Sequence, residues 1–344
     1  MNLPTTEAHA MPPHEDLSCR HIGTMPPRAY YIPFENATRA IAHTYAREES
    51  SRFASLCGDW TFSWFPRYED IPDNFVQKVR PLLGEHTLPV PSCWQTYGTL
   101  YGYDLPAYVN DNYPFPYDPP YLPRENPVGI YERDFMLDED WDGLRKYIVF
   151  EGVDSCVYLY VNGRFVGYSN VSHMTAEFDI TSFLSLGQNR VAAVVVKWNP
   201  GSYLECQDKW RMSGIFREVY LLARPSGHLQ DVTIRTKPSP ELRTADIFGS
   251  IEIVNPEDAL LTLYHPDGAV VGRSRPDMDG NFSFTIEQPL LWSAETPDLY
   301  TLLIEAAGEA IAIHTGVREV TIDGSVFKIN GRNIKFKEIG RAHV

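Results

Sequence analysis

The side chains with the most reactive chemistry are scattered along the chain, with no metal-binding or redox spacing. The five cysteines include no Cys-x-x-Cys pair, so neither a zinc site nor a disulfide framework is predicted. The histidines also lack metal-ligand spacing, and we expect His9, His14, His21 and His173 to be solvated. With 45 acidic residues, carboxylate pairs arise by chance, so no pair is assigned as an acid–base centre.

The balance of charge narrows the class of partner. The 344-residue chain has 45 acidic and 30 basic side chains, a formal net charge of −15. Phosphate backbones and anionic lipid repel such a chain, so nucleic acid and membrane surfaces are not expected as partners. No apolar stretch reaches the roughly 20 residues of a membrane span, and no apolar signal core is visible near the start. We expect a cytoplasmic protein, which the few scattered cysteines also favour.

Strand patterns fill the chain from about residue 55, so any functional side chain there must be positioned by strands and the turns between them. Runs rich in β-branched and aromatic residues, such as 157–161 and 191–198, are bounded by turn residues at short spacing. Asn162 and Gly163 separate the first of these runs from 164–168, which predicts a two-residue hairpin. Long amphipathic helices are missing between the strands, so a parallel β/α architecture is disfavoured. The chain is predicted to be all-β.

Other segments flank or interrupt these strands. Residues 1 to about 30 have no periodicity and are predicted to form a flexible arm, followed by a short helix within 36–53. Prolines crowd residues 113–123, which excludes a central strand and predicts a long, stiff loop with aromatic side chains. A domain junction is expected at 223–227, and the strands of 229–322 have the size of a β-sandwich.

Long motifs along the chain connect it to a known family. In chain order they are GDWTF (58–62), GYDLPAYVNDNYPFPYDPPYLPRENPVGIY (102–131), VYLYVNGRFVGYS (157–169), GSYLECQDKWRMSGIFREV (201–219), LLWSAETPDLY (290–300), GVREVTI (316–322) and FKINGRNIKFK (327–337). Their types and order resemble the front of the glycoside hydrolase family 2 β-galactosidases. The resemblance extends over about residues 30–337.

This resemblance implies an order of domains. An N-terminal arm (1–50) is followed by a jelly-roll, galactose-binding-like β-sandwich (51–223) and an immunoglobulin-like β-sandwich (224–322). A hairpin (323–337) would then lead into a catalytic (β/α)₈ barrel, which needs roughly 200 or more residues and is missing from this sequence. Residues 338–344, EIGRAHV, match a translation of a common sequencing-adapter sequence. We therefore expect a non-native tail on a truncated chain.

The resemblance also implies which residues meet a substrate. Asp208 matches a family aspartate that reaches galactose hydroxyls and helps to hold a monovalent cation, and a carboxylate suits both roles. Asn110 matches an asparagine on the loop that reaches the barrel, where an amide can donate and accept. From the residues alone, Asp208 could instead pair with Arg211 or Arg217, and Asn110 could satisfy loop backbone. The family's two catalytic glutamates lie on the barrel, so no catalytic residue is assigned.

The predicted function follows from this resemblance. We expect the amino-terminal fragment of a retaining β-galactosidase that hydrolyses terminal β-D-galactosides such as lactose, and we expect the fragment to be inactive alone. The full-length enzyme would use Mg²⁺ and Na⁺, which the fragment would not bind tightly, and would be a homo-oligomer. The alternatives are a free-standing carbohydrate-binding module, a structural or assembly element, and a relative of β-glucuronidase or β-mannosidase.

Tryptophan rings offer a second route to sugar recognition, because the C–H faces of sugars pack on aromatic rings. Most of these rings lie within strand motifs, where an aromatic side chain belongs in the core. Trp94, beside the 96–104 loop, is the expected exception. The others considered are Trp60, Trp64, Trp198, Trp210 and Trp292.

Overall fold

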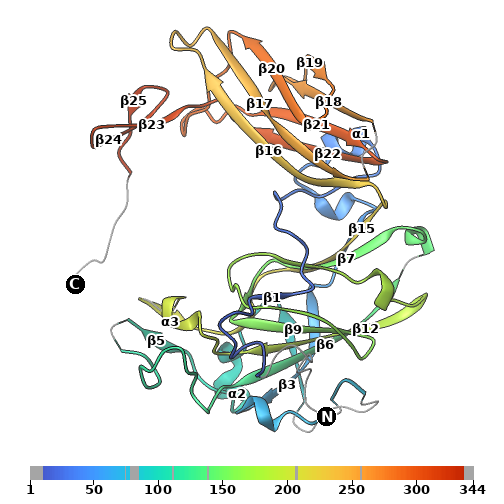
Figure 1. Cartoon of the computed structure of the whole chain (residues 1–344), viewed down its shortest axis with the longest axis vertical. Coiled ribbons are helices and arrows are strands. Elements are labelled where there is room, and N and C mark those ends of the chain that lie inside the picture. Colours follow the sequence, from blue (N-terminus) through green and yellow to red (C-terminus); the bar gives the residue numbers. More distant parts are fainter. Residues whose placement is uncertain are drawn as a thin grey trace. The chain divides into compact units, whose positions relative to one another are not determined.

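The computed structural model describes residues 11–73, 75–77, 85–110, 112–137, 139–205, 208–255 and 258–336. It consists mostly of antiparallel strands arranged as two β-sandwiches, which confirms the predicted all-β fold class (Figure 1). The chain divides into two compact units. The first joins the segment up to Pro27 with Phe53–Ala223, and the second joins Arg28–Arg52 with the chain from Arg224. The predicted tail 338–344 lies outside the described residues.

The first unit contains two main antiparallel sheets. The larger sheet has the order β1 (His21–Ile22), β10 (Arg164–Ser169), β9 (Cys156–Val161), β12 (Gly187–Val196), β6 (Val128–Leu137), β3 (Gly58–Phe65) and β4 (His86–Val90). The smaller sheet has the order β11 (Ala176–Asp179), β7 (Arg145–Phe150), β15 (Val219–Arg224) and β2 (Phe53–Ser55). Two short ribbons, β5 (Ala107–Val109) with β13 (Lys209–Arg211) and β8 (Val153–Asp154) with β14 (Gly214–Ile215), and the short helices α2 (Gly98–Tyr101) and α3 (Ser202–Glu205) complete the unit.

The predicted hairpin is confirmed between β9 and β10. Val161 and Arg164 are partners in the antiparallel register, so Asn162 and Gly163 form the two-residue turn. Their φ angles are 50° and 74°, the left-handed region that this turn requires and that asparagine and glycine tolerate best.

The larger sheet is buried on both of its faces around β9. Its inner face shares a core cluster with the smaller sheet, to which Leu159 of β9 and Leu221 of β15 contribute. Its outer face carries a second cluster, in which Tyr158 of β9 packs with Cys19 and Phe75 from outside the sheet. All six residues of β9 are therefore buried, although an antiparallel strand commonly has one polar face.

The predicted flexible arm is wrong for the part of residues 1–30 that the structure describes. β1 pairs with the edge strand β10, and Cys19 is buried on the outer face of the larger sheet. An open strand edge and an apolar outer face both need a cover, and this segment supplies it. Farther on, Phe34 bridges to Ala310 within the second unit. The predicted helix is shorter than 36–53, because α1 covers only Ala37–Ala42.

His14 also contradicts the prediction of solvated histidines. Its side chain is 1% exposed, and its ring lies 4.4 Å from that of Tyr68 and 5.9 Å from that of Tyr158, measured between ring centroids. Burial lowers the pKa of His14 to about 3, because the charged ring would lose its water. His21 and His173 are exposed as predicted, and His9 lies outside the described residues.

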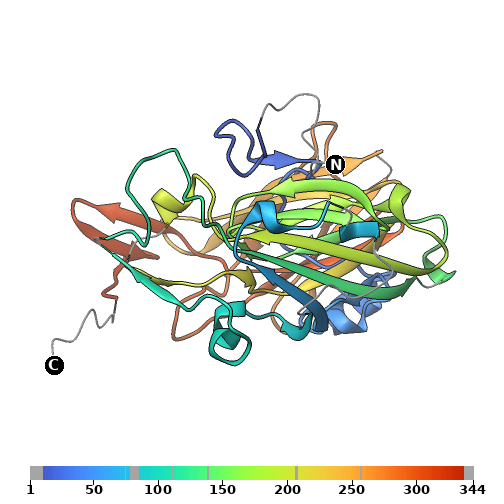
Figure 2. The ribbon, with the colours of Figure 1, turned by 90° about the horizontal axis from the view of Figure 1, so that it is seen from below.

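The second unit is a smaller sandwich with a ribbon at its end. One sheet has the order β16 (His228–Pro238), β17 (Thr244–Val254) and β20 (Asn281–Glu287), and the other has the order β19 (Val270–Ser274), β18 (Ala259–Tyr264), β21 (Tyr300–Ala306) and β22 (Glu309–Thr315). The ribbon of β23 (Val320–Asp323), β24 (Val326–Ile329) and β25 (Arg332–Asn333) projects away from these strands in both views (Figure 1, Figure 2).

In the segments that the structure describes, no helix combines the length and the apolar character needed to cross a bilayer.

Candidate functional site

A two-stranded ribbon brings together the two residues that the sequence singled out. β5 and β13 are antiparallel, with Val109 opposite Lys209 and Tyr108 opposite Trp210. Asn110 directly follows β5 and Asp208 directly precedes β13, so both residues lie at the same end of the ribbon. Asn110 is half-buried and Asp208 is exposed.

The ribbon presents aromatic rings beside the Asp208 carboxylate. The Tyr108 hydroxyl donates a hydrogen bond to Oδ1 of Asp208. The rings of Tyr108 and Trp210 meet edge to face, with 5.8 Å between their centroids, and remain 49% and 62% exposed. Asp208 has a φ of 51°, which turns the chain sharply into β13. An exposed carboxylate beside an exposed pair of rings can accept hydroxyl hydrogen bonds while a ring packs on a sugar face.

The expectation for the tryptophans needs one correction. Trp94, the expected exception, is fully buried, whereas Trp210 is the tryptophan of that set classed as exposed. The Trp94 ring packs in the core, and its indole nitrogen donates a hydrogen bond to Oδ1 of the half-buried Asp104 at 2.6 Å. The pairing with β5, which the sequence does not show, keeps Trp210 in a strand without a covering layer.

A buried ionic cluster anchors the base of the ribbon. Arg211, at the end of β13, is fully buried, and its guanidinium lies 3.4 Å from Oδ1 of Asp154 and 3.9 Å from Oε2 of Glu205. It also donates to the Ser202 hydroxyl at 3.1 Å. Arg211 thus has acidic partners other than Asp208. Because both partners of the Arg211–Asp154 pair are buried, the pair fixes where β13 leaves the fold.

The electrostatics of this cluster centre on Asp154. Burial raises the pKa of Asp154 to about 6, since an ionised carboxylate loses its water there. The positive charges of Arg211, Lys209 and Lys197 act in the opposite direction, and Glu205 adds to the rise. Arg217, the second arginine considered for Asp208, donates to the carbonyl oxygen of His173 at 3.1 Å.

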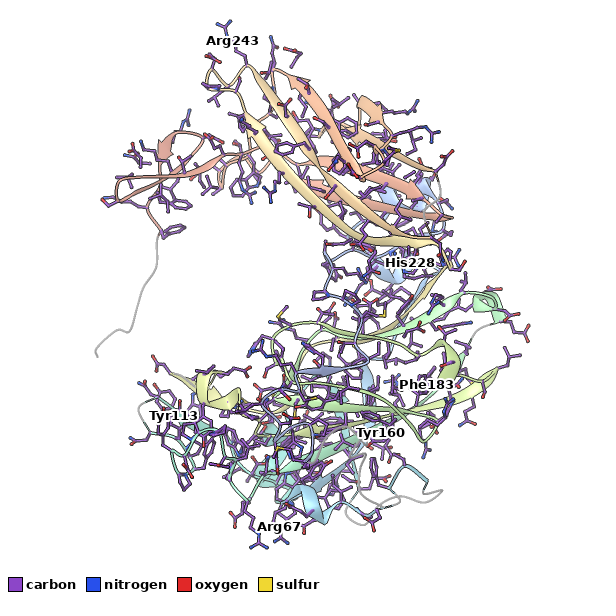
Figure 3. All side chains as sticks on the ribbon, viewed as in Figure 1. Arg67, Tyr113, Tyr160, Phe183, His228 and Arg243 are labelled. Carbon is purple, nitrogen blue, oxygen red and sulfur yellow. The ribbon has the colours of Figure 1, made fainter. Side chains whose placement is uncertain are left out.

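The proline-rich segment forms an aromatic cluster beside the ribbon. The ring of Phe115 lies 4.9 Å from that of Trp198 and 5.4 Å from that of Tyr203, between centroids. Tyr113, which Figure 3 labels at the end of the unit that carries α3 and β5, donates its hydroxyl hydrogen to the Tyr203 carbonyl. The predicted stiff loop is therefore braced by side chains from the neighbouring segment that contains α3.

Asp104 is a half-buried polar centre that sequence reasoning missed. Its Oδ1 accepts from the indoles of Trp94, at 2.6 Å, and Trp64, at 3.2 Å. Its Oδ2 accepts from Gln95 at 3.1 Å and from the buried Lys197 ammonium. Only its position in the GYDLP motif marked it in the sequence. The network ties the loop before β5 to β3 and β12, and so fixes one side of the ribbon.

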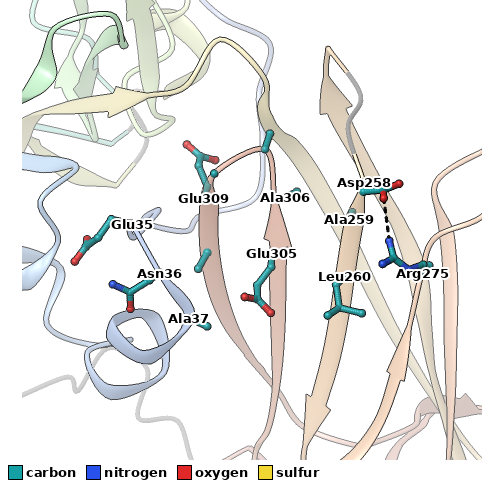
Figure 4. Close-up of a pocket in the computed structure, with 13 residues that line it drawn as sticks. Glu35, Asn36, Ala37, Asp258, Ala259, Leu260, Arg275, Glu305, Ala306 and Glu309 are labelled. Atoms are coloured by element: carbon teal, nitrogen blue, oxygen red, sulfur yellow. Dashed lines mark ion pairs between the residues drawn. The ribbon is translucent and has the colours of Figure 1, made fainter.

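A cavity in the second unit has a different character. Its volume is about 510 Å³, and its lining includes Glu305, Glu309 and the ion pair between Asp258 and Arg275, whose charged atoms are 3.6 Å apart (Figure 4). Glu309 is already neutralised by Arg224 at 2.7 Å. The lining residues include no aromatic ring, so this cavity offers no surface for sugar stacking.

Within the described residues, no three His, Cys, Asp or Glu side chains come together in a way that could hold a metal ion. At the candidate site, the exposed Asp208 carboxylate already accepts a hydrogen bond from Tyr108.

Comparison with known families assigns both units of the chain to one family. Residues 53–225 match the sugar binding domain of the glycosyl hydrolases family 2, and residues 227–318 match a second domain of the same family. The chain belongs to glycosyl hydrolase family 2. Both Asn110 and Asp208 fall within the segment that matches the sugar binding domain.

Individual members of the family show how much of a longer protein this chain covers. The chain is 41% identical over 331 residues to a β-galactosidase of Actinobacillus pleuropneumoniae, an alignment that covers 95% of this chain and 31% of the relative. It is 38% identical over 327 residues to a β-galactosidase of Staphylococcus xylosus, with 94% and 32% covered. The chain thus spans about a third of the length of these curated relatives, and it corresponds to their amino-terminal part.

Solved structures support the fold. A β-glucuronidase from an uncultured Clostridium sp. superposes with a TM-score of 0.65 at 20% identity, over 83% of this chain and 48% of that chain. A β-glucuronidase from Ruminococcus gnavus gives a TM-score of 0.67 at 17% identity, over 82% and 46%. At this level of identity the similarity describes the arrangement of the strands.

Proposed function

We propose that this chain is the amino-terminal part of a retaining β-galactosidase that hydrolyses terminal β-D-galactosides such as lactose, and that it is inactive alone. The observation that carries the proposal is the β5–β13 ribbon, which places Asp208 and Asn110 at one end and holds the Asp208 carboxylate against the Tyr108 hydroxyl, next to the exposed ring pair of Tyr108 and Trp210. The similarity to β-galactosidases over nearly the whole chain supports a galactoside as the substrate of the intact protein.

The ribbon would act by binding and orienting the sugar. Asp208 would accept hydrogen bonds from sugar hydroxyls, and the amide of Asn110 would both donate and accept. Charged acceptors form stronger hydrogen bonds than neutral ones, so Asp208 would contribute more to binding than Asn110. The two carboxyl groups of the retaining reaction would come from the barrel of the intact protein, which we propose to be a cytoplasmic homo-oligomer.

A monovalent cation fits Asp208 in part. A carboxylate is a hard oxygen donor of the kind that Na⁺ prefers, and the Asp208 side chain is exposed. Within the described residues, Asp208 belongs to no group of three or more His, Cys, Asp or Glu side chains that could hold a metal ion. Asp208 would therefore supply one ligand, and the barrel would supply the others together with the whole Mg²⁺ site.

A free-standing carbohydrate-binding module is the second candidate. The exposed rings of Tyr108 and Trp210 favour it, because an aromatic platform within the domain is what such a module needs. In that case the 344-residue chain would retain lactose without any barrel.

Activity measurements separate the two functions. The complete reading frame, recovered from source DNA, is expected to hydrolyse a chromogenic β-galactoside, and Asp208→Asn is expected to lower its kcat/KM roughly 100-fold, because a charged acceptor becomes a neutral amide. Asp279→Asn, on an exposed turn of the second unit, is the control and should leave kcat/KM unchanged. Turnover by the 344-residue chain itself would contradict the proposal.

A further inference from the structure

The proline-rich loop is a preformed surface, which is the first requirement of a binding site. The Tyr203 hydroxyl donates to the carbonyl oxygen of Tyr121 at 2.6 Å, and the Tyr113 hydroxyl donates to the carbonyl oxygen of Tyr203. The ring of Phe115, on the same loop, packs against the rings of Trp198 and Tyr203. Prolines restrict the backbone between these anchors, so a ligand would order little chain on binding.

One aromatic side chain stands out on this loop. Tyr117 is 71% exposed, which is unusual for a ring that also has firm neighbours. Its centroid lies 5.3 Å from that of Tyr113 and 5.7 Å from that of Tyr203, which it meets at 85°. The ring is therefore held in place while much of its surface remains open to solvent.

Tyr117 borders a cavity of about 420 Å³. The cavity is lined by three aromatic rings and one amide, from Tyr113, Phe115, Tyr117 and Asn112. This volume lies within the range of small-molecule sites. None of the four lining residues is charged, and none belongs to the Asp208 ribbon.

The chemistry of the lining selects the class of ligand. A hexopyranose has C–H faces that pack on aromatic rings and hydroxyl groups that an amide can both donate to and accept from. A uronic acid would bring a carboxylate to a lining whose described residues include no cation, on a chain whose net charge is −15. A neutral sugar brings no unpaired carboxylate to the lining and is not repelled by the negative charge of the chain.

We propose that the cavity beside Tyr117 is a second sugar-binding site, separate from Asp208, which takes a neutral hexopyranose unit. It rests on the proposed function only in that the ligand is a carbohydrate. A second site on the same end of the unit would capture an additional ring of an oligosaccharide or a separate glycoside.

Titration of the 344-residue chain tests this inference. We expect methyl β-D-glucopyranoside and lactose to bind with millimolar Kd by calorimetry, and sodium glucuronate to bind at least about 10-fold more weakly. Tyr117→Ala should weaken binding of the neutral sugars about 10-fold, whereas Tyr117→Phe should keep the affinity within about threefold, since the stacking face is retained.

A matched control lies on the same loop. Tyr121 is also 71% exposed but is not among the residues that line the cavity, so Tyr121→Ala should bind like the parent chain. Asn112→Ala, which removes the exposed amide of the same lining, is a second variant and should also weaken binding of the neutral sugars. It keeps the test decisive if the Tyr117→Ala chain folds poorly.

The outcomes distinguish the two proposals. Binding that survives Asp208→Ala but is weakened by Tyr117→Ala supports the second site, whatever the activity of the complete protein. Binding lost in Asp208→Ala and kept in Tyr117→Ala would overturn this inference and support the Asp208 site. An absence of saturable binding up to about 50 mM sugar would also overturn the inference, while leaving the activity test of Asp208 to decide the proposed function.

Discussion

The two sandwiches use the same kind of strand in opposite ways. In the first sandwich, the larger sheet is buried on both faces around β9, and every residue of β9 is buried. In the second, β20 alternates strictly between exposed and buried positions, as a sheet with one wet face requires. An uninterrupted apolar strand in an antiparallel sandwich thus indicates a covering segment outside the sheet. Here residues near Cys19 and Phe75 supply the cover.

The polar interiors differ as well. Among the described residues, the second sandwich buries one compact ion pair, in which Nε and Nη2 of Arg224 donate to Glu309 at 2.9 and 2.7 Å. In the first sandwich, the buried Asp154 pairs with Arg211 and the half-buried Asp104 pairs with Lys197, both near the candidate site. Buried charge in one unit closes the core, and in the other it positions the β5–β13 ribbon.

The largest effect is expected from the pair in the second sandwich. Glu309→Ala leaves the Arg224 guanidinium buried without its carboxylate and should lower the free energy of unfolding of this unit by about 3–5 kcal/mol. Chemical denaturation of the 344-residue chain measures the loss. Asp258→Ala is the control, because Asp258 lines the same cavity but is almost fully exposed. Equal stability of the two variants would show that the Arg224 pair contributes nothing special.

A pH-dependent effect is expected in the first sandwich. The pKa of Asp154 is about 6 in the fold, against an ordinary value of 3.8, so the folded chain holds this proton more tightly than the unfolded chain. Ionisation of Asp154 therefore costs stability as the pH rises from about 4 to about 6. Asp154→Asn removes this cost, and the variant should gain about 3 kcal/mol relative to the parent between pH 4 and pH 7.

Denaturation of both chains across this pH range measures the difference. Arg211, Lys209, Lys197 and Glu205 are the charges that act on Asp154, and all are unchanged in the variant. Asp142→Asn, at an exposed position of the same unit, should give a curve parallel to that of the parent. Parallel curves for Asp154→Asn as well would mean that Asp154 is solvated.

The smallest effect tests burial on the outer face. Ile130 of β6 is 1% exposed and belongs to the cluster away from the sandwich interior, so Ile130→Val should cost about 1 kcal/mol. The same change at Ile322 of β23, which is 74% exposed, should cost almost nothing. Thermal unfolding of the two variants compares a covered strand face with an open one. If neither change has an effect, the outer cluster is not well packed.

Local signals in the sequence predicted local structure well. The Asn162-Gly163 turn follows from residues that are adjacent in the chain, as does the exclusion of a central strand from the proline run. The family resemblance identified Asp208 and Asn110, and the ribbon places them at one end. Their roles in binding remain predictions.

Distant contacts could not be predicted from these signals. The cover over β9, the burial of His14 and the convergence of two indoles on Asp104 all depend on segments that meet only in the folded unit. Nothing in the residues around Trp94 and Trp210 distinguishes a buried ring from an exposed one. The pairing of strands in the folded unit decides which ring is exposed. Patterns within a short window cannot contain that information.

The β5–β13 ribbon also determines when the candidate site can form. Tyr108 and Asp208 are 100 positions apart, so a nascent chain cannot close this contact until Arg211 and its anchor at Asp154 have left the ribosome. Closing a loop of that length is slow compared with forming the β9–β10 hairpin. The ribbon should therefore be among the last parts of its unit to order during synthesis, and among the first to exchange its amide hydrogens with solvent.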